Sequence, residues 1–382
     1  MAQMAFSYKI QKRDSSDTTN MYHITPIITT TEQCNMACKY CYAGSSKSIL
    51  QNSEKLNNNF KLRIPLLLDF IDQVISYNNC KTTKIIFHGG EPLLVDPRNY
   101  KSIFTYIRDE KYPIEINIQT NGTLINDDYI DLFKEFNIKI GISLDGPGSV
   151  NDRTRIFKSG NGSFSAIFQN LKKLRAKGLD FGCLLTLSRS NIDNIYEIYN
   201  FFKENSFPYN LRPIFDSFYS IPKEFLITPQ EYASAFCKIF DMWFDDTEMD
   251  EILIYEFARI IAQFINPIDG LVSCSFLKDC SKHFVTFDMD GKIWPCNRLD
   301  KIPKFCYGNL NEKNLKDILI NPRVKNLSTR WNNLKDTDCR NCNISNYCHG
   351  GCPANSYFYY DTYFKKDYFC GTCLALTSTH VN

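Results

Sequence analysis

The sequence predicts an α/β fold with a mostly parallel sheet, followed by a cysteine-rich region. Residues 25–215 alternate short β-rich runs with helical patterns, which is typical of a parallel sheet. The sixteen cysteines gather near the two ends of the chain, with three in Cys34–Cys41 and ten in Cys274–Cys373. In a long chain this clustering indicates metal sites joined by an ordinary scaffold, rather than a disulfide framework.

The expected elements alternate through the first half of the chain. The β-rich runs predict six strands: Thr25–Thr30, Lys84–His88, Glu115–Thr120, Lys139–Leu144, Phe181–Leu187 and Asn210–Phe215. The helical patterns predict five helices: Leu62–Tyr77, Tyr100–Asp109, Asp127–Phe136, Phe164–Lys177 and Ile192–Glu204. The fourth helix has a start signal in Ser163 and a stop signal in Gly178. We expect this sheet to curl into a partial (β/α)6 TIM-like barrel, with its chemistry at the carboxyl ends of the strands.

The later part of the chain is expected to connect the barrel to a second domain. Asp241–Phe264 has a helical pattern and is predicted to bridge the two. Asp288–Gly291 predicts a hairpin turn, and not a calcium loop, because Leu299 stands where a calcium loop needs a bidentate glutamate. The expected regions are therefore a lead-in over 1–24, the partial barrel over 25–240, the bridge over 241–273 and the cysteine-rich domain over 274–382.

Composition excludes several classes of function. The hydrophobic content of 43% and charged content of 23% are ordinary for a globular protein. The net charge of +2 lacks the basic excess of a nucleic-acid-binding protein. No apolar run reaches the ~18 residues of a membrane span, and Met1–Asn20 lacks the apolar core of a signal peptide. We therefore expect a cytoplasmic protein with no nucleic-acid or membrane partner.

The first cysteine cluster, Cys34, Cys38 and Cys41, directly follows the first predicted strand. A complete 4Fe–4S cluster is bound by four thiolates, and three leave one iron open to another ligand. The alternatives are a zinc site or unpaired buried thiols. The run Cys34-Asn-Met-Ala-Cys38-Lys-Tyr-Cys41 resembles the cluster loop of the radical S-adenosylmethionine (SAM) superfamily. This resemblance implies that SAM chelates the open iron and yields a 5′-deoxyadenosyl radical, with Tyr40 contacting the adenine through its backbone.

Further motifs at strand ends resemble the same family. His88 precedes a stretch similar to the GGEP motif, which implies contacts to the SAM amino group from Gly89, Gly90, Glu91 and Pro92. Gln119–Gly122 and Ser143–Pro147 end the next two strands, and the resemblance places Ser143 at the ribose and Arg155 at the methionine carboxylate. Taken alone, the GGEP stretch is also compatible with an ordinary turn, and Arg155 with a solvated charge. Arg212, on the sixth strand, is more consistent with a structural role.

The C-terminal cysteines are similar in spacing to the SPASM extension of radical enzymes that modify peptides and proteins. That resemblance implies two auxiliary 4Fe–4S clusters, one on Cys274, Cys280, Cys296 and Cys352, and one on Cys339, Cys342, Cys348 and Cys370. A zinc ribbon is the alternative. Cys306 and Cys373 fall outside both sets, while Cys80, Cys183 and Cys237 are expected in the core.

The substrate is predicted less directly. The His-Gly-Gly-Glu-Pro form resembles maturases of ribosomally made peptides, so we expect a radical enzyme that oxidises or crosslinks such a peptide. The alternative is an anaerobic sulfatase-maturing enzyme, which converts a cysteine or serine to formylglycine. Two residues depart from that alternative: His88 stands in place of a glutamine, and Asn297 in place of an aspartate proposed there as the base.

Candidate catalytic residues and partners follow from this interpretation. His88, His283 and Asp300 are the candidates for proton transfer. The expected partners are a peptide or protein substrate and an electron donor such as flavodoxin or ferredoxin. A non-catalytic iron–sulfur or zinc-binding protein is the alternative from another class, and it leaves the three-cysteine loop unexplained.

Overall fold

The computed structural model describes residues 24–43, 62–79, 82–218, 221–246, 252–265 and 273–372. The predicted lead-in before residue 24, Cys80 and Cys373 lie outside the described residues. Within them, no helix is long and apolar enough to cross a membrane.

Helices and strands alternate as predicted up to the sixth strand. The strands are β1 Thr25–Thr31, β2 Thr83–Gly89, β3 Ile114–Thr120, β4 Lys139–Ser143, β5 Phe181–Leu187, β6 Tyr209–Pro213, β7 Phe284–Asp288, β8 Lys292–Trp294 and β9 Gly308–Asn309. The first nine α-helices of the described residues are α2 Ile64–Tyr77, α3 Pro97–Asp109, α4 Asp127–Glu135, α5 Gly148–Asn151, α6 Phe164–Ala176, α7 Ile195–Glu204, α8 Pro229–Asp245, α9 Tyr255–Ile265 and α10 Leu315–Leu319. The remaining helices are α11 Pro322–Ser328, α12 Arg330–Leu334, α13 Ser345–Cys348 and α14 Pro353–Tyr360.

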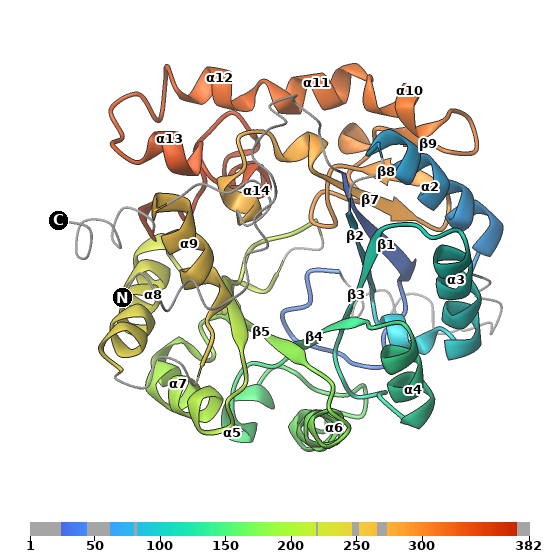
Figure 1. Cartoon of the computed structure of the whole chain (residues 1–382). Coiled ribbons are helices and arrows are strands. Elements are labelled where there is room, and N and C mark those ends of the chain that lie inside the picture. The colour runs from blue at the N-terminus through green and yellow to red at the C-terminus, as the bar shows by residue number, and fades with distance from the viewer. Residues whose placement is uncertain are drawn as a thin grey trace.

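The sheet is a partial barrel with an extension. Its strand order is β6-β5-β4-β3-β2-β1-β7-β8-β9, and β1 to β6 pair in parallel with their sequence neighbours. These six strands form a curved, unclosed sheet with helices on its outer face (Figure 1). The α/β class and the unclosed six-stranded barrel are therefore confirmed.

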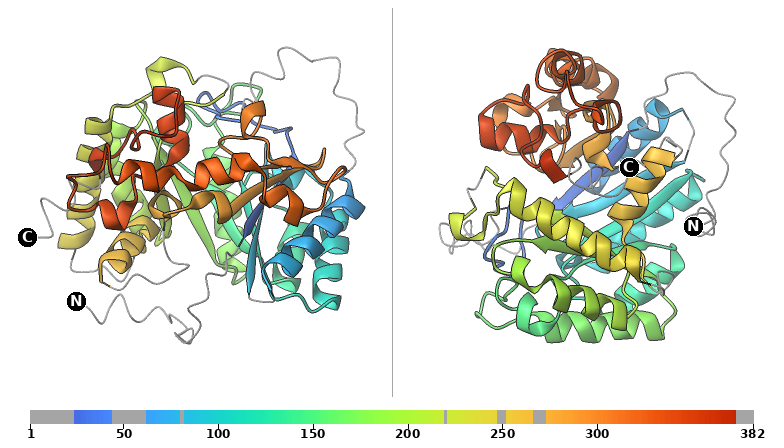
Figure 2. Two further views of the ribbon diagram at one scale, coloured as in Figure 1. Left: turned by 90° about the horizontal axis from the view of Figure 1, so that it is seen from above. Right: turned by 90° about the vertical axis from the view of Figure 1, so that its left-hand side faces the viewer.

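The cysteine-rich region is joined to this sheet, which the sequence did not predict. Strand β7 pairs in parallel with β1, and β8 and β9 continue the sheet in antiparallel fashion. The predicted hairpin is present between β7 and β8, where the Asp288 carboxylate accepts hydrogen bonds from the Asp290 and Lys292 main-chain N–H groups at 3.0 Å each. Helices α10 to α14 gather on one side of the barrel (Figure 2).

The outer layer of the barrel fixes which side chains face inward. On β2, Phe87 is fully buried and packs edge-on against Tyr100 and Phe104 of α3, with ring centroids 5.5 and 5.3 Å apart. Burial of such a ring is worth about 1.5–3 kcal/mol. Because side chains alternate along a strand, the next residue, His88, points toward the barrel interior.

Helix α6 begins with a different cap from the predicted one. The Ser163 hydroxyl donates to the Arg155 carbonyl at 2.8 Å and caps nothing. Instead the Asp152 carboxylate accepts from the Phe164 N–H at 2.8 Å, a cap from a residue too distant in sequence for the motif to signal. The predicted stop is confirmed, since Gly178 has a φ of +71°.

The predicted bridging helix Asp241–Phe264 is wrong in its extent. The structure has two helices, and α8 starts upstream at a capping box made by Thr228 and Glu231, with Pro229 at its first position. The predicted boundary at residue 240 therefore falls inside a helix. The second helix, α9, starts at Tyr255.

Candidate active site

The cysteine loop leaves the carboxyl end of β1 and is held against the segment after α5. The main-chain N–H groups of Ala37 and Lys39 donate to the carbonyls of Ile156 and Thr154, at 2.8 and 2.9 Å. These bonds fix the loop at the end of the barrel where parallel-sheet enzymes carry their chemistry.

The three thiols of this loop are close enough to act on one another electrostatically. Burial raises the pKa of Cys38 to about 12, and the charges of Cys41 and Cys34 add to this effect. The Cys34 sulfur accepts from the Met36 N–H at 3.4 Å and from the Asn121 amide at 3.7 Å. Donors aimed at a sulfur stabilise it as a thiolate, the form that binds iron. This donor set fits a 4Fe–4S cluster with one iron left open.

The GGEP turn packs directly on the start of the cysteine loop. The N–H groups of Gly90 and Glu91 donate to the carbonyls of Thr31 and Gln33, at 2.7 and 2.8 Å. Gly89 has a φ of +137°, and a Cβ atom at Gly90 would collide with the Gln33 carbonyl. Glycine is therefore required here so that the two backbones can approach.

Replacing Gly90 with alanine is expected to push the cysteine loop away from β2 and lower the iron content of the first cluster. We expect a loss of folding stability of about 2–3 kcal/mol, as for other steric clashes in a packed region. Iron analysis and thermal unfolding measure both effects. The matched control is Gly371→Ala, because a Cβ there meets no atom within 4 Å. Normal iron content in Gly90→Ala would contradict this account of the loop.

Glu91 is fully buried and joins the ends of β2 and β3. Its carboxylate accepts hydrogen bonds from the Leu93 N–H at 2.9 Å, the Thr120 hydroxyl at 2.5 Å and the Asn121 N–H at 2.7 Å. Burial raises its pKa. Three of its acceptor positions are thus used within the protein. Glu91 therefore holds the end of β2 against the end of β3, in addition to being the predicted ligand for an ammonium group.

Tyr40, Asp145 and Arg155 form a buried polar group beside Cys38. The Tyr40 hydroxyl donates to the Asp145 carboxylate, and the Arg155 guanidinium donates to the Tyr40 hydroxyl at 3.4 Å. Asp145 is fully buried and also accepts from the Thr186 N–H at 3.0 Å. The Nε–H of Arg155 is buried with no partner among the described residues. An orphaned guanidinium donor fits a ligand carboxylate, which is the role that the sequence predicts for Arg155.

Asp145 was not singled out from the sequence, although it lies in the Ser143–Pro147 motif. The predicted ribose contact, Ser143, accepts a hydrogen bond from the Gln119 amide at 3.2 Å. Gln119 is the second-to-last residue of β3 and also packs against Gly141, where a Cβ would overlap its side chain. These residues line the same carboxyl end as the cysteine loop, so the structure brings the predicted SAM contacts together.

A second group of side chains connects the barrel to the cysteine-rich region. The Tyr42 ring lies 6.5 Å from His88 and 5.6 Å from Phe215, centroid to centroid. Its hydroxyl accepts from the Asn297 amide at 2.8 Å. The Arg298 guanidinium lies 3.3 Å from the centroid of Phe215. We call Tyr42, His88, Phe215, Asn297 and Arg298 the Tyr42 group, and only His88 and Asn297 of these were predicted to matter.

His88 has a hydrogen-bonding state that argues against a role as base. The Gly89 N–H donates to its Nδ1 at 2.7 Å, which places the ring proton on Nε2. Burial lowers the pKa of His88 to about 4, so the ring is neutral at pH 7. A neutral ring with this tautomer offers a donor, not an acceptor, at Nε2.

The other two proton-transfer candidates, His283 and Asp300, lie in different places relative to the cysteine loop. His283 lies at the amino end of β7, where its carbonyl accepts from the Thr25 N–H at 2.7 Å. Its main chain is thus separated from the cysteine loop by the length of β1, roughly 20 Å, and we assign His283 no proton-transfer role. Asp300 lies near Tyr42, and burial raises its pKa to about 7. Its N–H donates to the Cys296 carbonyl, so a bound cluster would reset this pKa, and we assign it no proton-transfer role.

The first predicted auxiliary set comes together around Cys352. The charges of Cys352, Cys296 and Cys274 all raise the pKa of Cys280, after the larger effect of burial. Arg298 donates to the Cys352 sulfur at 3.3 Å. Arg212 lies near Cys274 and forms an ion pair with Glu256 at 2.6 Å, in keeping with its expected structural role.

The second predicted auxiliary set also comes together. Burial raises the pKa of Cys348 to about 12, and the charges of Cys370, Cys342 and Cys339 add to it. The thiols that act on Cys280 all belong to the first set, and the thiols that act on Cys348 all belong to the second set. Across the described ranges, no three His, Cys, Asp or Glu side chains converge closely enough to hold a single metal ion. Four thiols apiece fit the donor chemistry of two complete 4Fe–4S clusters.

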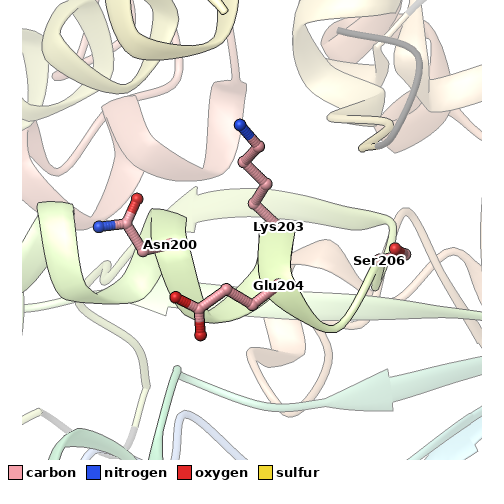
Figure 3. Close-up of a pocket in the computed structure, with 4 residues that line it drawn as sticks. All are labelled: Asn200, Lys203, Glu204 and Ser206. Carbon is pink, nitrogen blue, oxygen red and sulfur yellow. The ribbon is translucent and has the colours of Figure 1, made fainter. Parts of the chain in front are cut away.

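The remaining cysteines of the described residues stand apart from these sets. Cys183 is buried in β5, Cys237 is half-buried on α8, and the Cys306 thiol donates to the Gly308 carbonyl at 3.5 Å. A surface hollow lined by Asn200, Lys203, Glu204 and Ser206 lies on and after α7 (Figure 3). Its lining residues precede the amino end of β6, the opposite end of the strand from the side that carries the cysteine loop, so the hollow is unrelated to the site.

Comparison with known proteins identifies both parts of the chain. The family model for the Radical SAM superfamily matches residues 28–202. The model for SPASM, an iron–sulfur cluster-binding domain, matches residues 279–343. The two matches fall on the barrel and on the cysteine-rich region.

Curated relatives match over most of their length. A serine-type anaerobic sulfatase-maturating enzyme of Bacteroides thetaiotaomicron is 27% identical over 345 residues, which cover 85% of this chain and 81% of the relative. A cysteine-type anaerobic sulfatase-maturating enzyme of Clostridium novyi is 29% identical over 333 residues, covering 84% and 85%.

A solved structure shares the fold. Native anSMEcpe with bound AdoMet and Cp18Cys peptide has a TM-score of 0.79 at 20% identity, covering 93% of this chain and 96% of that chain. Streptococcus suis SuiB bound to precursor peptide SuiA has a TM-score of 0.64 at 14% identity, covering 92% of this chain and 76% of that chain.

Proposed function

Because the chain belongs to the radical SAM superfamily and carries a SPASM domain, we propose that it oxidises a serine or cysteine of a sulfatase polypeptide. One observation carries this proposal: sulfatase-maturating relatives of both types match more than four fifths of the chain and of their own length. The peptide-maturase interpretation favoured from the sequence loses its preference, because it rested on His88 and Asn297 alone. The superfamily and the domain imply a SAM-binding 4Fe–4S cluster and auxiliary clusters.

The chain's own residues supply binding and orientation. When bound, the first cluster and SAM supply a radical that abstracts hydrogen from carbon. Arg155 would hold the SAM carboxylate through its orphaned Nε–H, and Asp145 and Tyr40 keep the guanidinium in place. His88 carries an Nε2–H as a hydrogen-bond donor, at the position where the resemblance to sulfatase-maturing enzymes implies a glutamine amide.

The direct test is the mass of two peptides after anaerobic incubation with SAM and a reductant. One peptide spans the target serine of a sulfatase, and the other spans the target cysteine. Oxidation of serine to the aldehyde removes two hydrogens, whereas oxidation of cysteine also exchanges sulfur for oxygen. Either change supports the proposal. If both masses stay unchanged while a peptide encoded beside the gene loses two hydrogens, the peptide-maturase alternative replaces it.

Replacing His88 with glutamine is expected to retain peptide oxidation, because the glutamine amide also carries N–H donors. Replacing His88 with leucine removes the donor and should lower kcat/KM for the peptide about tenfold, the value of one hydrogen bond of about 1.4 kcal/mol. Uncoupled SAM cleavage should be unaffected in both variants. Equal losses in the two variants would contradict the donor role.

A further inference from the structure

Arg330, at the start of α12, is a buried arginine with an unusual set of partners. Its Nε–H donates to the Tyr363 carbonyl at 2.6 Å. Its two Nη groups donate to the carbonyls of Gly351, Gly350 and Lys365, each at 2.8 Å, and to the Ser356 hydroxyl at 3.2 Å. Only 5% of the residue is exposed. The guanidinium thus organises main-chain carbonyls from two separate loops.

These carbonyls belong to the backbone between the two auxiliary sets. Gly350 and Gly351 lie between Cys348 of the second set and Cys352 of the first. Gly350 has a φ of +81°, and a Cβ there would lie 3.5 Å from both Arg330 Nη1 and the Cys339 sulfur. The guanidinium therefore holds a loop that leads to the first set and that passes close to Cys339 of the second set.

The positive charge of Arg330 is not neutralised by a direct ion pair. No carboxylate of the described residues lies within 4.0 Å of it. The acidic groups that act on it are the thiols Cys280, Cys352 and Cys339 and the carboxyl of Asp367. Asp367 is itself buried, and it accepts hydrogen bonds from the Cys352 N–H at 2.7 Å and the Phe369 N–H at 2.8 Å. A buried cation is costly without compensating negative charge, and thiolate-bound clusters supply it.

We propose that Arg330 is a positioning residue shared by the two auxiliary cluster sites, and that its charge raises the reduction potentials of both. A cluster becomes more negative when it is reduced, so a nearby buried cation stabilises the reduced form. Asp367 acts in the opposite direction on the same sites. This inference rests on the ligand sets given above and not on the identity of the substrate.

The test is an anaerobic redox titration of the purified protein without peptide, followed by electron paramagnetic resonance. Cys34, Cys38 and Cys41 are replaced by alanine in every sample, so that the first cluster gives no signal. In this background, Arg330→Gln should shift both auxiliary midpoint potentials to more negative values. Arg330→Lys keeps a charge and should shift them less, and Asp367→Asn should shift them to more positive values. Arg323→Gln, at an exposed arginine of α11, is the matched control and should shift neither.

Each outcome decides the inference. Unchanged potentials in Arg330→Gln, a shift confined to one cluster, or equal shifts in the Gln and Lys variants would overturn it. Iron loss in Arg330→Gln that Arg330→Lys does not share supports a cation common to both sites. Iron loss in both variants would show a purely structural role of the guanidinium fork and overturn the electrostatic one. Since no peptide is present, failure of the proposed sulfatase reaction would leave these results unaffected.

Discussion

Replacing Cys38 with alanine is expected to abolish SAM cleavage completely. Cys38 is the middle thiol of the loop after β1, and it faces the Tyr40–Asp145–Arg155 group, whose charges act on its pKa. With two thiolates instead of three, the loop no longer holds a 4Fe–4S cluster with a single open iron. The measurement is 5′-deoxyadenosine formed per protein under dithionite, together with the iron content.

The matched control for this variant is Cys183→Ala. Cys183 is buried in β5 and lies outside every proposed ligand set. Its loss should cost about 1 kcal/mol of stability through the small cavity that it leaves, with no change in iron content. Retained SAM cleavage in Cys38→Ala, or equal loss in Cys183→Ala, would refute the assignment of the loop.

Most of the barrel was predictable because its signals are local. Alternating β-branched runs and helical patterns located all six strands within about two residues of their observed bounds, and the motif residues follow those strands directly. Once the strands are parallel, their carboxyl ends meet at one edge. The convergence of Cys34, Glu91, Ser143 and Arg155 follows from this topology.

The parts that escaped prediction depend on contacts between distant segments. Asp152 replaces Ser163 as the cap of α6, β7 joins β1 across more than 250 residues of chain, and Asp145 pairs with Tyr40. None of these has a sequence signal within one element. Arg330 is the clearest case, since its partners become visible only when two loops fold around it.

The sequence favours a ribosomally made peptide as substrate because of single residues that differ from the sulfatase-maturating pattern. His88 and Asn297 depart from the sulfatase-maturating pattern, and they outweighed the overall layout of the cysteines. The structure shows that both side chains belong to the Tyr42 group, where His88 accepts a hydrogen bond from the Gly89 N–H and Asn297 donates one to Tyr42. Single polar positions can differ between enzymes that share one fold, so they discriminate poorly between families.

The second large effect is expected from Cys348→Ala, which should cleave SAM yet fail to oxidise the peptide. Conversion of a serine or cysteine to an aldehyde removes two electrons, and hydrogen abstraction accounts for only one. The second electron needs an acceptor outside the substrate. Cys348 belongs to a complete four-thiol set with Cys339, Cys342 and Cys370, which leaves no position open for a substrate ligand. A role in electron transfer is the one that such a closed set permits.

The measurement pairs 5′-deoxyadenosine formation with the mass of the sulfatase peptide in the same reaction. We expect near wild-type SAM cleavage and an unmodified peptide in Cys348→Ala. Cys306→Ala is the matched control, because this half-buried thiol of the same region bonds only the Gly308 carbonyl among the interactions described, and it should retain both activities. Normal oxidised product in Cys348→Ala would remove the second set from the electron path. Loss of SAM cleavage as well would tie that set to the folding of the barrel, and would equally contradict a role confined to electron transfer.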